Sequence, residues 1–187
     1  MTYKISNDNS DLDQIRPESR KDKNMQVQFA GQTVTLRERP LQVGDQLPDF
    51  KLVAGNLQDK SLADFPGKLL ILTFPSVDTD VCAMELAKFN REVEKLDGFV
   101  TLAVSMDLPF AQARWCQAKA VHRLETLSDF RSQQFARDYG VYIEGVGLLA
   151  RAVFVADEKR RIVYAEYCDD IGTEPNYQAA LEAAKKI

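Results

Sequence analysis

The chain has 187 residues, of which 45% are hydrophobic and 28% charged, and this size and composition fit one soluble globular domain with a sizeable core. Its net charge of −4 and its pI near 5.1 argue against nucleic acid as a partner, because nucleic-acid binding needs a basic surface. No apolar run approaches the roughly 18 residues of a membrane span, and the N-terminus lacks the apolar core of a signal peptide, so we expect a cytoplasmic protein with no membrane partner.

The N-terminal part of the chain changes character near Met25. Residues 1–24 are polar, with scattered apolar residues among many charges, and we interpret them as a flexible extension, with a short helix as the alternative. From Met25 onward, hydrophobic and polar residues alternate on both sides of Ala30-Gly31, which predicts a β-hairpin. The folded domain is therefore expected over residues 25–187.

The middle and end of the chain alternate between strand and helix patterns. Continuous apolar runs at Leu69–Phe74 and Phe99–Ser105 indicate strands that are buried on both faces. The remaining elements that we expect are a strand over Phe50–Val53, helices over 80–96, Pro109–Lys119 and Arg131–Tyr139, a hairpin of Ala152–Val155 with Ile162–Glu166, and a last helix from Pro175. This order predicts an α/β, thioredoxin-like three-layer sandwich with a mixed central sheet and an N-terminal β-hairpin.

Cys82 stands just after the junction between the first buried strand and the helix that follows it, in the segment FPSVDTDVC. Free backbone N–H groups and the positive end of the helix dipole at this place favour a thiolate, which is the nucleophilic form of cysteine. Thr79 can cap the helix or direct its hydroxyl at the sulfur, and Pro75 fixes the backbone where the chain leaves the strand. Most free cysteines are small buried hydrophobes, so position alone leaves both interpretations of Cys82 open.

The chain offers little material for metal binding. It has three cysteines, no C-x-x-C pair and one histidine, His122, so we expect neither a metal nor another cofactor. In a reducing cytosol, disulfides tend to be transient and catalytic rather than structural. His122 could partner a cysteine in a hydrolase, but we favour a helix-end or surface histidine because a thiolate at a helix start needs no base.

Two motifs carry a family resemblance. Pro75, Thr79 and Cys82 match the peroxiredoxin signature P-x-x-x-T-x-x-C at every fixed position, and the segment DLPFAQARWC ends at Cys116. With VQFAGQTVTL, TLSDFR and LLARAVFV, these segments make the chain resemble the bacterial thiol peroxidases of the Tpx subfamily, which are atypical 2-Cys peroxiredoxins. The resemblance covers nearly everything from Val27 to the C-terminus.

The resemblance implies a thiol-dependent peroxidase that reduces hydrogen peroxide and organic hydroperoxides. Cys82 would attack the peroxide and become a sulfenic acid, Cys116 would condense with it to an intramolecular disulfide, and thioredoxin would reduce that disulfide. Arg151, in LLARAVFV, matches the active-site arginine of the family, whose fixed charge can stabilise the thiolate and the charge that develops on the peroxide oxygens. We also expect a homodimer. Because both cysteines lie on predicted helices and a disulfide needs Cα atoms within about 7 Å, at least one helix should unwind.

Two single positions, Ala87 and Cys168, depart from the family pattern. Ala87 stands where many family members have an arginine. Phe110, within the matching segment, could line an apolar substrate pocket or belong to the core. Cys168 has no counterpart in the family pattern, and neighbouring aspartates disfavour its thiolate, so we interpret it as a spectator.

Two other functions compete with the peroxidase. A disulfide oxidoreductase uses the same fold, but its chemistry requires the C-x-x-C pair that this chain lacks. A peroxide-sensing disulfide relay protein would use the same two cysteines, and the sequence leaves that role open beside the peroxidase.

Overall fold

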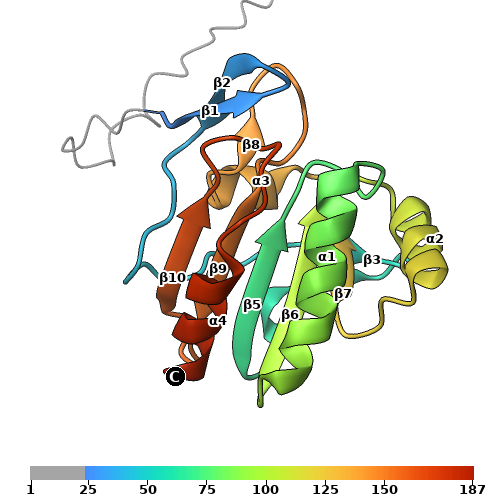
Figure 1. Cartoon of the computed structure of the whole chain (residues 1–187), viewed down its shortest axis with the longest axis vertical. Coiled ribbons are helices and arrows are strands. Elements are labelled where there is room, and N and C mark those ends of the chain that lie inside the picture. The colour runs from blue at the N-terminus through green and yellow to red at the C-terminus, as the bar shows by residue number, and fades with distance from the viewer. Residues whose placement is uncertain (1–23) are drawn as a thin grey trace, which may run out of the picture.

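The computed structural model describes residues 24–187, so the predicted extension lies, apart from its last residue, outside the described part of the chain. A seven-stranded sheet forms the centre of the molecule (Figure 1). In spatial order its strands are β10 (Ile162–Tyr167), β9 (Ala152–Ala156), β5 (Lys68–Thr73), β6 (Phe99–Ser105), β7 (Glu125–Ser128), β3 (Leu52–Ala54) and β4 (Asp59–Lys60). Strand β6 runs parallel to β5 and β7 and the other pairs are antiparallel, so the predicted mixed sheet is confirmed.

A second, three-stranded sheet contains the predicted N-terminal hairpin. It consists of β1 (Gln26–Phe29), β2 (Gln32–Arg37) and β8 (Tyr142–Ile143). The turn between β1 and β2 has positive φ at both central residues, 51° at Ala30 and 77° at Gly31. This conformation matches the right-handed twist of the two strands that it joins.

The helices complete the three layers. They are α1 (Asp80–Glu92), α2 (Pro109–Lys119), α3 (Gln134–Asp138) and α4 (Tyr177–Lys185), with 3₁₀ turns at Leu62–Asp64 and Val93–Lys95. Successive side chains of a strand point to opposite faces, and on β5 the pair Leu70 and Leu72 packs with α1, α2 and α4. Leu69 and Ile71 face the other core, which contains α3 and the three-stranded sheet. The predicted α/β three-layer architecture is therefore confirmed, and β5 is an apolar run because both of its faces are covered.

The element boundaries differ from the sequence prediction in several places. Helix α1 ends at Glu92, and a 3₁₀ turn replaces the end of the helix predicted over 80–96. Strand β3 covers Leu52–Ala54 rather than the predicted Phe50–Val53. Helix α3 begins at Gln134 rather than Arg131, because Gln133 has a left-handed φ of 56° and cannot lie inside a helix. Helix α4 begins at Tyr177 after the cap Asn176, two residues beyond the predicted start at Pro175. Strand β7 was not predicted, since the sequence Glu-Thr-Leu-Ser contains no apolar run and becomes a strand through its pairing with β6 and β3.

No helix in residues 24–187 is both long enough and apolar enough to cross a membrane.

Candidate active site

The junction between β5 and α1 presents the thiol of Cys82. Thr79 caps α1 in an extended conformation, and Cys82 is the third residue of the helix. The Thr79 hydroxyl donates a hydrogen bond to Cys82 Sγ at 2.7 Å and accepts one from the Cys82 backbone N–H at 3.4 Å. Pro75 is buried just after the strand. The three residues of the predicted P-x-x-x-T-x-x-C motif therefore lie together, and the sulfur is fully buried.

Arg151 reaches the same sulfur from the neighbouring strand. It immediately precedes β9, and the pairing of Ala152 with Thr73 places it beside the end of β5. Its Nη2 donates to Cys82 Sγ at 3.2 Å, and its Nε donates to the carbonyl oxygen of Ile171 at 3.0 Å. The residue is only 1% exposed. A buried guanidinium must be paired, and the sulfur of Cys82 is one of its partners.

Arg151 also pairs with the carboxyl group of Glu85, a site residue that was not predicted from the sequence. Its Oε2 accepts a hydrogen bond from Arg151 Nη1, and the side chain is fully buried. Burial raises the pKa of Glu85 to about 7, against the opposing effect of the Arg151 charge. Glu85 Oε1 has no hydrogen-bond partner among the described residues. Cys82 and Glu85 thus share one buried cation.

A sequence signal for Glu85 did exist. The residues of α1 that are buried are Cys82, Glu85, Leu86 and Phe89, at spacings of three, four and seven. This spacing places all four on one helix face, which is the face that enters the core. A glutamate on such a face needs a cationic partner, so the pattern predicts an ion pair without identifying the partner.

Cys116 lies on a different helix from Cys82, and both are free thiols in this structure. Cys116 is half-buried on α2, and its Sγ is 3.9 Å from Thr126 Oγ1 on β7. Burial raises the pKa of the Cys116 thiol, and the contact with Thr126 opposes this shift. The reduced arrangement therefore favours a neutral thiol at Cys116.

Cys168 is buried near the same ion pair. Its backbone N–H donates to the carbonyl oxygen of Arg151 at 3.0 Å. Burial, followed by the charges of Glu166 and Glu85, raises the pKa of Cys168 to about 12. A thiol in this environment stays protonated near neutral pH, which argues against its use as a nucleophile.

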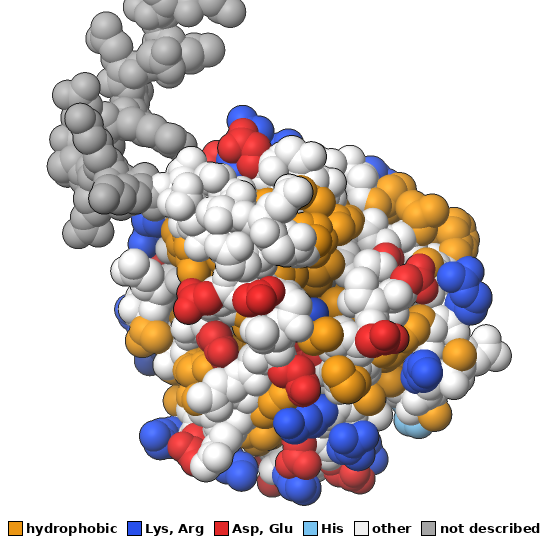
Figure 2. Space-filling view, turned by 45° about the horizontal axis from the view of Figure 1, so that its top comes forward, with side chains coloured by type: hydrophobic (Ala, Val, Ile, Leu, Met, Phe, Trp, Pro, Cys, Tyr) orange, Lys and Arg blue, Asp and Glu red, His pale blue; other side chains and the backbone are white. Residues whose placement is uncertain are grey.

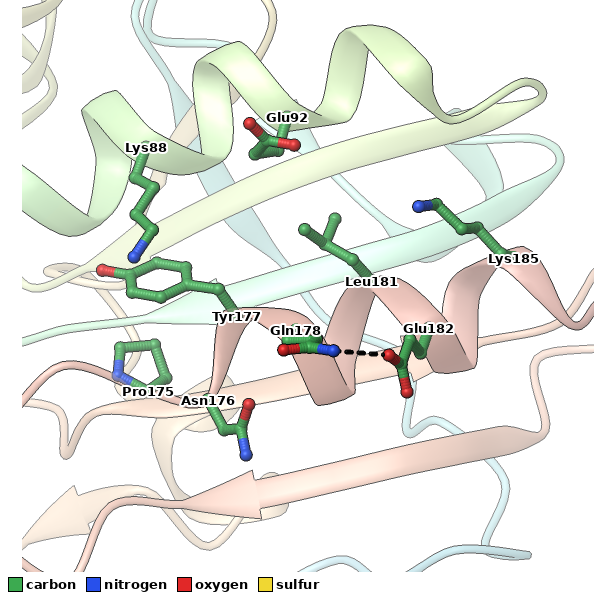
Figure 3. Close-up of a pocket in the computed structure, with 9 residues that line it drawn as sticks. All are labelled: Lys88, Glu92, Pro175, Asn176, Tyr177, Gln178, Leu181, Glu182 and Lys185. Atoms are coloured by element: carbon green, nitrogen blue, oxygen red, sulfur yellow. Dashed lines mark hydrogen bonds between the residues drawn. The ribbon is translucent and has the colours of Figure 1, made fainter.

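A groove away from Cys82 lies between α1 and α4. It has a volume of about 520 Å³ and is lined by none of the predicted site residues (Figure 3). Lys88 Nζ lies 3.7 Å from the centre of the Tyr177 ring, and that ring packs on Phe89 with centroids 5.0 Å apart. Tyr177 therefore packs α4 against α1.

The remaining candidates are on the surface. His122 is exposed, and Phe110 is 62% exposed at the start of α2. Figure 2 shows hydrophobic side chains on the right-hand side of the molecule, where Figure 1 places α2. Phe110 is thus not a core residue. Within residues 24–187, no group of three or more His, Cys, Asp and Glu side chains is arranged to hold a metal ion.

This chain is similar in sequence to known redoxin-family proteins and thiol peroxidases. The profile of the Redoxin family matches residues 42–181. A thiol peroxidase of Bacillus subtilis is 47% identical over 163 residues, which are 87% of this chain and 98% of that protein. A thiol peroxidase of Streptococcus sanguinis is 48% identical over 160 residues, which are 85% of this chain and 98% of that protein.

Solved structures agree with the sequence relatives. A peroxiredoxin-like protein from Aquifex aeolicus is similar with a TM-score of 0.79 and 38% identity, over 86% of this chain and 96% of that one. A thiol peroxidase from Chromobacterium violaceum gives a TM-score of 0.82 over 88% of this chain and 97% of that one. The identity to the latter is 24%, so that likeness supports the fold alone.

Proposed function

The chain belongs to the redoxin family and is a peroxiredoxin-type thiol peroxidase, and from this premise we propose that Cys82 is its peroxide-attacking thiolate and Cys116 its resolving thiol. In the first step the Cys82 thiolate attacks the terminal peroxide oxygen. The O–O bond breaks, the sulfur becomes a sulfenic acid, and the leaving oxygen takes up a proton to give water or an alcohol.

The observation that carries the proposal is the pair of donors on Cys82 Sγ. The Thr79 hydroxyl and Arg151 Nη2 lie 2.7 and 3.2 Å from the sulfur, and both can stabilise negative charge on it. The same two groups can then donate to the oxygens of a bound peroxide, where charge develops as the O–O bond breaks. In this proposal Pro75 forms part of the wall that shields the reacting atoms.

The second half of the cycle uses Cys116. Its thiol attacks the sulfenic sulfur of Cys82, the S–S bond forms, and one water molecule leaves. Reduction then needs two electrons from an external dithiol, and we propose thioredoxin, because the chain has no C-x-x-C pair of its own. The proposal includes a cytoplasmic location, because a transient disulfide can cycle in a reducing compartment. It also includes a homodimer.

The proposal is tested by a coupled assay on the full chain. Hydrogen peroxide or cumene hydroperoxide is supplied with thioredoxin, thioredoxin reductase and NADPH, and NADPH oxidation is followed. We expect turnover with both peroxides, together with a Cys82–Cys116 disulfide in peptide maps of protein treated with one equivalent of peroxide. A disulfide between other cysteines, or turnover that does not depend on thioredoxin, would contradict the proposed cycle.

The shared cation predicts a pH effect at Glu85. Since the pKa of Glu85 is about 7, its carboxyl is neutral below that pH and competes as an anion for Arg151 above it. In the wild type, the rate of Cys82 oxidation by hydrogen peroxide should therefore fall about threefold as pH rises through 7. Glu85→Gln keeps an acceptor for Arg151 but has no charge to titrate, so the decline that Glu85 causes should be absent from this variant.

Glu92→Gln is the control, because it removes an equal charge from the same helix at a surface ion pair with Lys95. Its pH profile should follow the wild type in stopped-flow measurements between pH 6 and 8.5. If Glu85→Gln shows the same decline as the wild type, the two anions do not compete for Arg151.

The third cysteine is expected to be a spectator in turnover. Cys168→Ala should keep the thioredoxin-coupled rate within about twofold of the wild type, because its thiol stays protonated near neutral pH. The coupled assay measures this directly. Peptide maps of peroxide-treated wild type that contain a disulfide to Cys168 would overturn this expectation.

A further inference from the structure

Helix α2, which carries Cys116, is attached to the protein by few buried side chains. Those are Pro109, Gln112 and Trp115. One of the three, Gln112, is polar, and its amide lies in the middle of the buried face. Helices of globular proteins are usually held by an apolar stripe. The attachment of α2 therefore depends unusually strongly on how the Gln112 amide is satisfied.

Gln112 makes two hydrogen bonds to the sheet. Its Nε2 donates to Ser105 Oγ at the end of β6 and to the carbonyl oxygen of Leu127 on β7, both at 2.9 Å. The side chain is fully buried, and its Oε1 has no partner among the described residues. Burying an amide costs free energy that only such bonds offset, so these two contacts define where α2 rests.

The network continues from Ser105 to the segment that leads into α1. Ser105 Oγ donates to Asp107 Oδ2 at 2.7 Å, and the same carboxylate accepts from the Val77 backbone N–H at 2.8 Å and from Ser76 Oγ at 2.7 Å. Ser76 and Val77 belong to the loop between β5 and Cys82. A single carboxylate thus joins the loop before one cysteine to the amide that holds the helix of the other.

We propose that Gln112, Ser105 and Asp107 form a hydrogen-bond network that holds α2 on the sheet of the reduced protein. Breaking this network limits the rate at which the Cys82–Cys116 disulfide forms. The inference rests on the proposed roles of the two cysteines. Cys116 follows Gln112 by one helical turn on the same side of α2, so freeing Gln112 frees the turn that carries the thiol. Packed helices lie 8–10 Å apart axis to axis, whereas a disulfide needs Cα atoms within about 7 Å.

Loss of Gln112 and loss of Asp107, at the two ends of this network, should affect different chemical steps. Gln112 holds only α2, so its loss should affect disulfide formation and leave peroxide attack unchanged. Asp107 also holds the loop before Cys82, so its loss should disturb the position of the thiolate as well. Both are positioning residues, and the two chemical steps separate their effects.

The experiment follows a single turnover of pre-reduced protein with hydrogen peroxide. Trp115, the only tryptophan of the chain, is buried beside Cys116 and reports the movement of α2 by its fluorescence. Cys82 oxidation is the phase whose rate depends on peroxide concentration, and disulfide formation is the later phase that does not. Acid-quenched samples analysed by mass spectrometry assign each phase to its product.

Gln112→Met keeps the length of the side chain and removes both hydrogen bonds. We expect disulfide formation to become about fivefold faster, since each lost bond contributes modestly to the stability of the closed state. Cys82 oxidation should stay within about twofold of the wild type. Gln117→Met, an exposed change on the same helix, is the matched control and should alter neither phase.

Two further comparisons complete the test. Ser105→Ala, which leaves α2 itself intact, should also accelerate disulfide formation, and it decides the question if Gln112→Met does not fold. Asp107→Ala should in addition slow Cys82 oxidation, while Asp107→Asn, which still offers one acceptor oxygen, should restore that rate. Hydrogen exchange of Gln112→Met should show lost protection over 109–119, with 68–73 and 99–105 unchanged.

The outcomes are distinguishable from failure of the proposed function. If the wild type forms no Cys82–Cys116 disulfide, the proposed cycle is wrong. If the wild type forms this disulfide, but folded Gln112→Met and Ser105→Ala form it no faster, the proposed cycle stands and the proposed role of the network is wrong.

Discussion

Replacement of Cys82 by serine is expected to reduce peroxidase activity to below about 1% of the wild-type rate, because a serine hydroxyl does not ionise near neutral pH as a thiol can. The change is nearly isosteric and Thr79 and Arg151 remain as donors, so the loss should come from the nucleophile and not from the pocket. Steady-state turnover of cumene hydroperoxide with thioredoxin measures the effect. Residual activity above a few per cent would defeat the assignment.

Cys168→Ser provides the matched control for that substitution. It makes the same chemical change at another buried cysteine that lies near the same arginine. Wild-type activity in Cys168→Ser, with thermal unfolding of both variants close to the wild type, would show that the loss in Cys82→Ser is chemical rather than structural. Equal losses in both variants would point instead to damage of the shared buried cluster.

Replacement of Cys116 by serine is expected to stop catalytic cycling after one turnover. Cys82 should still reduce one equivalent of peroxide, because Thr79 and Arg151, the two donors to its sulfur, are unchanged. The sulfenic acid then has no internal thiol to condense with, so the thioredoxin-linked rate should fall below about 5% of the wild type. Rapid-quench measurement of peroxide consumed per protein, followed by dimedone labelling, distinguishes one turnover from none.

A small dithiol supplies the control for Cys116→Ser. Dithiothreitol is small enough to reach the sulfenic acid directly and should restore multiple turnovers without a second protein thiol. The dimedone adduct should map to Cys82 in this variant. Normal cycling of Cys116→Ser with thioredoxin would show that Cys116 is not the resolving residue.

The sequence by itself determined the central sheet and the local frame of the site. The apolar runs at 69–74 and 99–105 predicted β5 and β6 because both faces of these strands are covered, and the boundaries of α2 were predicted without error. Pro75, Thr79 and Cys82 were found together because they occupy one strand–helix junction. Such short-range geometry follows from local chain conformation, which the sequence pattern reports.

Only the tertiary structure decided which distant groups meet at that junction. Arg151 contacts Cys82 and Glu85 across 69 and 66 residues of sequence, and Gln112 reaches the carbonyl oxygen of Leu127 on a strand that the sequence did not predict. Hydrophobic periodicity shows which side chains are buried, but a buried polar group is stabilised by a particular partner, and the partner is chosen by strand pairing and helix packing. The helical spacing of Glu85 could therefore predict a buried charge, whereas its sharing of Arg151 with Cys82 required the fold.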